Sequence, residues 1–365
     1  MKIKEICELI EQVAPLSYQE GYDNAGLIIG NKETEVSKIL LALDTTEKVI
    51  DEAIALQCNL IVAHHPIIFK GLKKINGNNE IEKVVIKAIK HDIAIYVAHT
   101  NLDNVLKHGV STKFAQKLNL VNCRILAPKS NLLVKLNINV PNSHVEQIKN
   151  VLFENGAGQI GNYSECSFGL EGNATFKGNE DANPFIGETN KREHVSEIKL
   201  EFITPAHLVS LLLSKAKAAH PYEEMAYEIV PVSNELQEVG SGVIGELPEE
   251  MSADAFLGHL KTSMKLEVIK FTNFDKPIKK VAVCGGSGSF LTGVAIKNQA
   301  DVFVTADFKY HDFFDAENKL MLCDIGHFES EISTLEIFYE IITEKFINFA
   351  VIFCKTNTNP VKYFK

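Results

Sequence analysis

The chain has 365 residues, of which 45% are hydrophobic and 23% charged, an ordinary balance for two or three globular domains. The formal net charge of −10 argues against a broad nucleic-acid-binding face, because such a face requires a basic surface. No stretch approaches the roughly 18 uninterrupted apolar residues of a membrane span, and the seven scattered cysteines contain no CxxC pair, so we expect reduced thiols and a cytoplasmic location.

The first 125 residues alternate helix-like and strand-like segments. Apolar residues recur with helical spacing in four segments, 3–13, 46–56, 80–90 and 110–118. Short apolar runs typical of buried strands lie at 38–43, 59–63 and 93–98. This order predicts a largely parallel sheet with helices on both faces.

The middle of the chain has a different pattern. Residues 132–141 and 197–205 alternate apolar and polar side chains, as strands with one solvated face do, and helical stretches follow at 143–154 and 206–219. Residues 156–194 are rich in Gly, Asn and Glu and are expected to form long loops or hairpins. The repeated strand-helix-strand unit predicts an α+β sandwich of the ferredoxin-like type.

The α/β pattern resumes at Lys279 and continues to the C-terminus. Strands are predicted within 279–284, 300–308, 321–327 and 348–354, and helices at 291–298 and 329–346. We therefore predict an α/β fold with a split core and a mostly parallel sheet. Residues 1–125 and 240–365 would form that core around an inserted α+β domain at 130–235.

Polar and ionisable side chains gather where the predicted strands end. Ligand sites in open α/β sheets form at the carboxyl ends of the strands, so we expect a functional site there. The residues concerned are Asp44, His64, His65, His99, Thr100, Asp103, Thr305, Asp307, His311, His327 and Glu331.

The spacing of these residues favours a metal site. His327 and Glu331 are four residues apart and share one face of a helix, and imidazole and carboxylate groups are the usual ligands of zinc, iron or manganese. Pro66 keeps His65 extended, so the His64 and His65 rings point to different sides and could each serve one metal ion. The alternative is structural, because a single His after a strand more often caps it, and an HxxxE pair also arises on solvated helices.

Two further motifs have two interpretations each. The glycine turn of CGGSGSF could bind phosphate through Gly285, Gly286 and Ser287, or it could only pack closely. The segment His220-Pro-Tyr-Glu-Glu could be a second metal site, although a surface turn is favoured.

With these motifs, the sequence resembles the dinuclear metal-centre family known as GTP cyclohydrolase 1 type 2 homologues, also called the NGG-one-interacting-factor-three-like family. Two positions depart from the family pattern: Tyr22 stands where Trp is more usual, and Ala306-Asp307 replaces a Gly-Asp pair. The motifs that carry the resemblance are YDNAGLIIG (22–30), LALDTT (41–46), VAHHPIIF (62–69), AHTNLD (98–103), CGGSGS (284–289), TADFKYHD (305–312) and IGHFESE (325–331).

The resemblance implies roles for particular residues. Two divalent metal ions, zinc, manganese or iron, would be held by His64, His65, Asp103, His327 and Glu331, with Glu331 as the bridge. Asp44, Thr100 and Asp307 would support these ligands, and His99 and His311 would line the site and shuttle protons. The family also implies a homohexamer and a PII-like insert that contains the HPYEE segment.

The expected function is metal-dependent hydrolysis of a nucleotide or a related small molecule, with GTP cyclohydrolase-like chemistry or phosphoester cleavage as specific forms. The alternative is a regulatory or metallochaperone ring that binds metal without turnover, since a ligand set alone does not prove catalysis.

Overall fold

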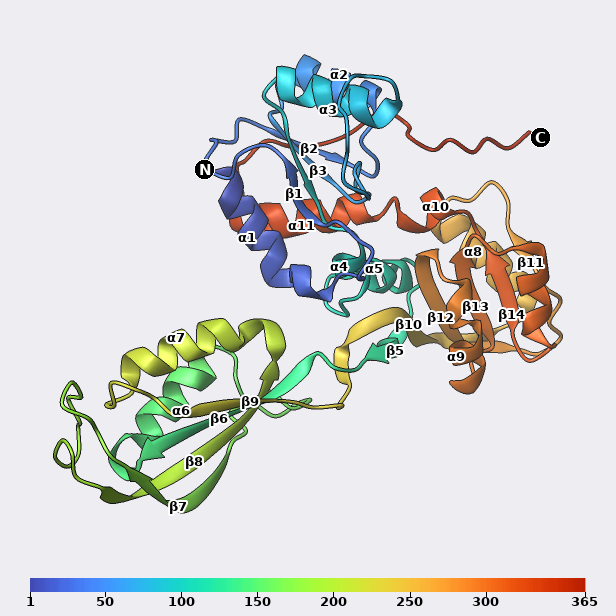
Figure 1. Cartoon of the computed structure of the whole chain (residues 1–365). Helices are drawn as coiled ribbons and strands as arrows, with labels where there is room; N and C mark the ends of the chain where they lie inside the picture. The colour runs from blue at the N-terminus through green and yellow to red at the C-terminus, as the bar shows by residue number, and fades with distance from the viewer. Residues whose placement is uncertain (365) are drawn as a thin grey trace. The chain divides into compact units, whose positions relative to one another are not determined.

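The computed structural model describes residues 1–364, and it divides the chain into two compact units. The core unit consists of Met1–Pro128 and Glu238–Lys365, and the inserted unit of Lys129–Gln237. Within the described chain, no helix is long and apolar enough to cross a membrane. Figure 1 shows the chain leaving the core unit at β5 and returning to it through β10.

The N-terminal part of the core unit is built on a five-stranded sheet. All strands run parallel except the edge strand β1, which is antiparallel to β4. The three central strands are fully buried, as their apolar sequences predict. In spatial order the strands are β1 (Gly26–Ile29), β4 (Ala94–Val97), β3 (Leu60–Ala63), β2 (Ile39–Ala42) and β15 (Val351–Phe353).

Helices cover both faces of this sheet. Figure 1 shows α2 (Glu47–Leu56) beside α3 (Glu80–Lys90) on one face, and α1 (Ile3–Val13) beside α11 (Thr334–Lys345) on the other. Helices α2 and α3 begin at side chains that accept hydrogen bonds from the first turn, Thr46 and Asn79 respectively. The C-terminal helix α11 thus packs on a sheet built mainly from N-terminal strands.

The C-terminal part of the core unit contains a second, mixed sheet. Strands β12, β13 and β14 run parallel to one another, and β10 and β11 pair with them in the antiparallel sense. Apolar clusters cover both of its faces, one around Phe256 and the other around Phe303. In order the strands are β11 (Lys270–Phe271), β14 (Met321–Asp324), β13 (Val302–Ala306), β12 (Ile278–Ser287), β10 (Leu236–Met251) and β5 (Val121–Lys129).

Short helices occupy the region where the two sheets of the core unit meet. Helix α10 (His327–Glu331) contacts β12 and β13, and α5 (Val110–Lys117) contacts β12, α10 and α11. The remaining helical segments of the core unit are α4 (Thr100–Asp103), α8 (Ala253–Ser263), α9 (Thr292–Lys297) and the 3-10 turns η1 (Leu16–Tyr18), η4 (Ser289–Leu291) and η5 (Tyr310–Ala316).

The inserted unit is a four-stranded antiparallel sheet with two helices on one face (Figure 1). The strands lie in the order β7 (Phe168–Phe176), β8 (Glu193–Pro205), β6 (Leu133–Pro141) and β9 (Tyr227–Pro231). With α6 (Val145–Glu154) after β6 and α7 (Val209–Ala219) after β8, this is the βαββαβ arrangement of a ferredoxin-like sandwich. The turns η2 (Asn142–His144) and η3 (Ala206–Leu208) precede the two helices.

The predicted fold class is confirmed, with two refinements. The core unit holds two sheets, where the alternating pattern had suggested a single one, because periodicity identifies strands but not their partners. The long helix expected at 329–346 is two helices, α10 and α11, separated at Ile332 and Ser333. The predicted likeness of the insert to PII-like domains stays a prediction.

Candidate metal centre

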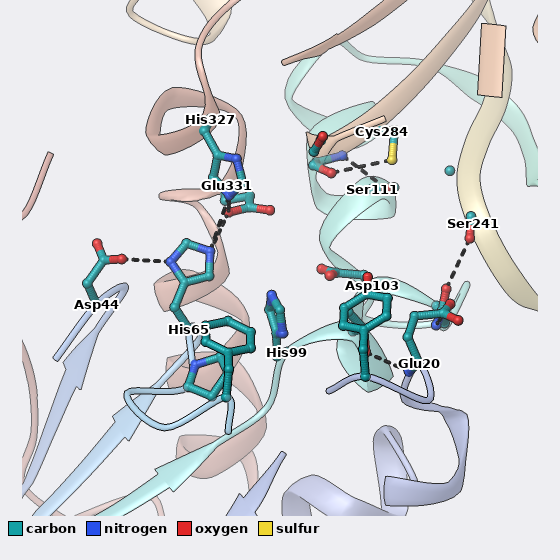
Figure 2. Close-up of a pocket in the computed structure, with 18 of the residues that line it drawn as sticks. Glu20, Asp44, His65, His99, Asp103, Ser111, Ser241, Cys284, His327 and Glu331 are labelled. Carbon is teal, nitrogen blue, oxygen red and sulfur yellow. Dashed lines mark hydrogen bonds and ion pairs between the residues drawn. The ribbon is translucent and has the colours of Figure 1, made fainter. Parts of the chain in front are cut away.

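Six potential metal ligands from both ends of the chain meet in the core unit. Figure 2 shows His65, His327 and Glu331 converging, with His99 and Asp103 facing them across the cavity. Three groups of donor atoms each lie within 4.8 Å of one another. The groups are His64, His65 and His99; His65, His327 and Glu331; and His64, Asp103 and Glu331.

Strand ends position the N-terminal ligands. The backbone N–H of His65 donates to Leu43 O at 2.9 Å, so the turn after β3 stays attached to the end of β2. The His64 and His65 rings diverge, with centroids 4.9 Å apart and planes at 45°. His99 follows β4 and precedes α4, whose last residue is Asp103.

A short helix and a glycine turn position the C-terminal ligands. Helix α10 begins at His327 after Gly326, which has a φ of 93°, and it ends at Glu331. Gly286 has a φ of 64°, and a Cβ atom at this position would overlap Glu331 Oε1. The CGGSGS motif therefore needs glycine here to admit the Glu331 carboxylate.

The two oxygens of Glu331 face different histidines. Oε2 lies 2.9 Å from His65 Nε2 and 3.1 Å from His327 Nε2. Oε1 lies 3.7 Å from His64 Nε2. A carboxylate oriented in this way can serve two adjacent cation positions.

The second ring nitrogen of each histidine is held by an acceptor. The Nδ1 atoms of His65, His99 and His327 lie 2.6–2.8 Å from carboxylate oxygens, and that of His64 lies 2.9 Å from a backbone carbonyl. An Nδ1–H that donates to such an acceptor leaves Nε2 as the unprotonated ligand atom facing the centre. The acceptors are Asp44 for His65, Asp23 for His99, Asp307 for His327 and Ala98 for His64.

Two buried polar atoms in this cluster have no hydrogen-bond partner. They are His64 Nε2 and Asp103 Oδ1, which lie 3.6 Å apart. Buried polar atoms are nearly always paired, and an imidazole nitrogen facing a carboxylate oxygen is a suitable donor set for a divalent cation. The residues present therefore fit a metal ion.

Burial and the neighbouring charged groups shift the pKa values of several candidate ligands. Burial and the neighbouring Glu331 raise the pKa of Asp103, whereas burial lowers the pKa of His64. Hydrogen bonds with Asp44 and Glu331 outweigh burial and raise the pKa of His65 to about 9. Hydrogen bonds with Asp307 and Glu331 raise the pKa of His327 to about 10. A bound dication would take the place of these protons.

The cluster opens into a cavity of about 510 Å³, a size suited to a small molecule. Tyr22, Phe69 and Phe290 line it, and each of these rings is at least half exposed. Cys284 also lines the cavity, and burial raises the pKa of its thiol to about 12.

The structure brings most of the predicted residues together, with His311 as the exception. Thr100 lines the cavity. Thr100 donates through its backbone N–H and its hydroxyl to Asp23, behind His99. His311 is exposed, packs beside Tyr310 and is not among the residues that line the cavity, so its proton-shuttle role stays a prediction.

The glycine turn has a packing role in this structure. The Gly285 and Gly286 N–H groups donate to Ser111 and Ser330 within the protein. Phosphate binding by Gly285, Gly286 and Ser287 stays a prediction.

Asp23 is a site residue that the sequence reasoning missed. Its Oδ1 accepts a hydrogen bond from His99 Nδ1 at 2.8 Å, and several hydrogen bonds hold the pKa of this carboxyl well below its usual range despite its burial. Asp23 belongs to the YDNAGLIIG motif, which was the available signal, but no predicted strand end marked it as part of the site.

Comparison with known proteins identifies close relatives over the full length. The family model described as Duf34/NIF3 (NGG1p interacting factor 3) matches residues 1–360. A Halalkalibacterium halodurans protein named GTP cyclohydrolase 1 type 2 homolog is 38% identical over 364 residues, covering 98% of each chain. A Bacillus subtilis protein of the same name is 37% identical over 366 residues, covering 99% of this chain and 98% of its own.

Solved structures show the same fold. A Bacillus cereus protein related to NIF3 superimposes with a TM-score of 0.85 at 37% identity, covering 100% of this chain and 99% of its own. A Staphylococcus aureus protein gives a TM-score of 0.77 at 32% identity with the same coverage.

The C-terminal segment supplies a hydrogen bond that supports the centre. Thr358 Oγ1 donates to Asp44 Oδ2 at 2.6 Å, and Asp44 Oδ1 accepts from His65 Nδ1 at 2.7 Å. We predict that Thr358→Val weakens zinc binding about tenfold, because Asp44 then orients His65 less firmly. Calorimetric titration with zinc measures this effect.

Thr356→Val is the matched control, because the Thr356 hydroxyl donates to Glu52 instead of to a residue of the centre. Equal zinc affinities for the two variants would show that Thr358 does not support the site.

Proposed function

This chain belongs to the Duf34/NIF3 family, and from that premise we propose that it is a dinuclear metal-dependent hydrolase acting on a nucleotide or a related small molecule. The observation that carries the proposal is the orientation of Glu331, whose two oxygens face two different sets of ligands. His64 and Asp103 complete one set, and His65 and His327 complete the other.

Two divalent ions at such positions would lower the pKa of water and polarise a substrate oxygen. The residues of the chain would orient the groups around these ions and transfer protons. Asp23 fixes the His99 ring, whose centroid lies 5.2 Å from that of His64 and 5.5 Å from that of His65, within the cavity. An imidazole held beside the ligands can accept a proton from the nucleophile and return it to the leaving group.

A nucleotide-like substrate is supported by the aromatic rings around the cavity. Tyr22, Phe69 and Phe290 are 70%, 50% and 68% exposed, and all three line the same cavity as the ligands. Exposed rings beside a polar centre can stack against a planar base while its phosphates approach the metal ions. The net charge of −10 makes the metal ions the main source of attraction for those phosphates.

The proposed setting is a cytoplasmic homohexamer. The seven cysteines are all free, which supports a reducing compartment. We propose the hexamer because the family resemblance implies it. Each chain has a mass of 40.5 kDa. Light scattering on the purified protein is expected to give six times this mass, and a monomeric mass would contradict the assembly.

Removing the bridging carboxylate tests the dinuclear hydrolase directly. We predict that Glu331→Gln loses at least about 100-fold in nucleotide turnover by the zinc-, manganese- or iron-loaded protein, because both cation positions lose a shared ligand. Product analysis on a panel of nucleotides, together with metal content per chain, measures the loss.

Glu329→Gln is the matched control on the same helix, since the Glu329 carboxylate accepts from Asn359 instead of facing the centre. If no metal supports turnover of any nucleotide, while Asp103→Ala still changes binding to a partner, the hydrolase proposal is wrong and the regulatory alternative stands.

The exposed rings that line the cavity lead to a separate prediction about substrate affinity. Phe290→Leu is expected to raise KM for a purine nucleotide about tenfold, because a stacked base loses its ring partner. The KM for glycerol phosphate, which has no base, should stay the same. Phe314→Leu removes an equally exposed ring outside the cavity and serves as the control. Equal effects on both substrates would contradict base stacking.

A further inference from the structure

The inserted unit contains a cavity that the metal centre does not explain. Its volume is about 640 Å³, which is sufficient for a small molecule. The walls come from β7, from the 177–186 loop and from the HPYEE segment, and include Phe176, Phe185, Glu197 and Tyr222. We call it the insert cavity.

The pleat of β8 directs Glu197 into this cavity. Ile198 and Leu200 pack in the apolar cluster beneath α6 and α7, so Glu197 projects from the opposite face of the sheet. The Glu197 side chain is only 7% exposed and lines the cavity. Among the described residues, no lysine, arginine or histidine makes an ion pair with it, and a buried carboxylate without a counter-charge is costly.

The hydroxyl of Tyr222 is a second buried polar group at this cavity. Its oxygen is buried and makes no well-formed hydrogen bond, although it lies near enough to the Glu197 carboxylate to interact with it. Burial and that carboxylate raise the pKa of Tyr222, so the hydroxyl stays protonated at neutral pH. The Tyr222 oxygen thus borders the cavity without a hydrogen-bond partner, and Glu197 borders it without an ion-pair partner.

Aromatic rings form the rest of the wall. The Tyr222 ring centroid lies 6.1 Å from that of Phe185 and 6.4 Å from that of Phe176. Ring faces carry partial negative charge and attract cations. The carboxylates that line the cavity outnumber its one lysine, Lys177; they are Asp181, Glu197, Glu223 and Glu224. This balance disfavours a phosphate or carboxylate ligand.

A metal ion is also disfavoured here. His220 Nε2 lies 2.9 Å from Asn139 O, and His220 Nδ1 accepts from the Tyr222 N–H at 3.1 Å, so both ring nitrogens are occupied. Within residues 1–364, the three candidate metal-binding groups all lie in the core unit. The HPYEE segment is therefore a turn that places Tyr222, as the sequence reasoning favoured.

We propose that the insert cavity binds a small organic cation, a protonated or quaternary amine, with Glu197 as its counter-ion and the Tyr222, Phe176 and Phe185 rings as its walls. The cation supplies the positive charge that Glu197 lacks. Its alkyl groups contact the rings, and an N–H group, where present, can donate to the Tyr222 oxygen.

Choline chloride and its neutral isostere 3,3-dimethyl-1-butanol test the charge requirement on the full-length protein. Calorimetric titration at constant ionic strength is expected to give saturable choline binding at one site per chain, with a Kd below about 10 mM. The isostere should bind at least about tenfold more weakly. Absence of saturable choline binding, or equal binding of the two probes, overturns the proposal.

Variants locate the site. Glu197→Gln should weaken choline binding at least about tenfold, and Glu171→Gln, the same change at an exposed position of β7 outside the cavity, should leave it unchanged. Phe185→Leu alters a ring that is 54% exposed, so it tests the wall with little risk to folding, and several-fold weaker binding is expected. Wild-type choline affinity in either folded cavity variant places the cation elsewhere and overturns the proposal.

Discussion

A single buried carboxylate governs the arrangement of the core unit. Glu331 is only 3% exposed, and its carboxylate faces the imidazoles of His64, His65 and His327. A buried ionised group is tolerated only when it is paired and hydrogen-bonded. Hydrogen bonds from His65 and His327 outweigh burial and hold the pKa of Glu331 well below its usual range. Gly286 leaves space for the Glu331 carboxylate, and the short helix α10 carries Glu331 at its end.

The contacts of Glu331 with His64 and His65 connect the C-terminal half of the core unit to the N-terminal half. Strands β3 and β4 end beside each other because they are parallel neighbours, which delivers His64, His65 and His99 to one sheet edge. Helix α10 follows the last strand of the other sheet and brings His327 with Glu331. Two of the three candidate donor groups combine residues from both halves of the split core, so these groups form only when both halves are folded together.

The buried carboxylates of the two units differ in the partners that the chain gives them. In the core unit, Glu331 and Asp44 both hydrogen-bond to the imidazole of His65. In the inserted unit, Glu197 interacts with the Tyr222 hydroxyl and, at longer range, with His220, and among the described residues it forms no ion pair. A carboxylate without an ion-pair partner gains stability from a bound counter-charge, which is the physical basis for proposing a cationic ligand for the insert cavity.

The sequence alone determined most helices and strands of residues 1–118 and 279–365, the interruption of the core by an insert, and the residues at the strand ends. Hydrophobic period and strand-end position are local properties, so they can be read from the sequence. It could not determine that the core has two sheets, because strand pairing is non-local. The sequence did not identify Asp23 and Thr358 for the same reason, because each hydrogen-bonds to a residue that is distant in the sequence. Asp23 accepts from His99, and Thr358 donates to Asp44. His311 is the opposite case. It follows a predicted strand, as the ligands do, but its ring does not line the cavity. Only the tertiary structure decides which side chains share a space, because the distances that define a site are set by how separate elements pack.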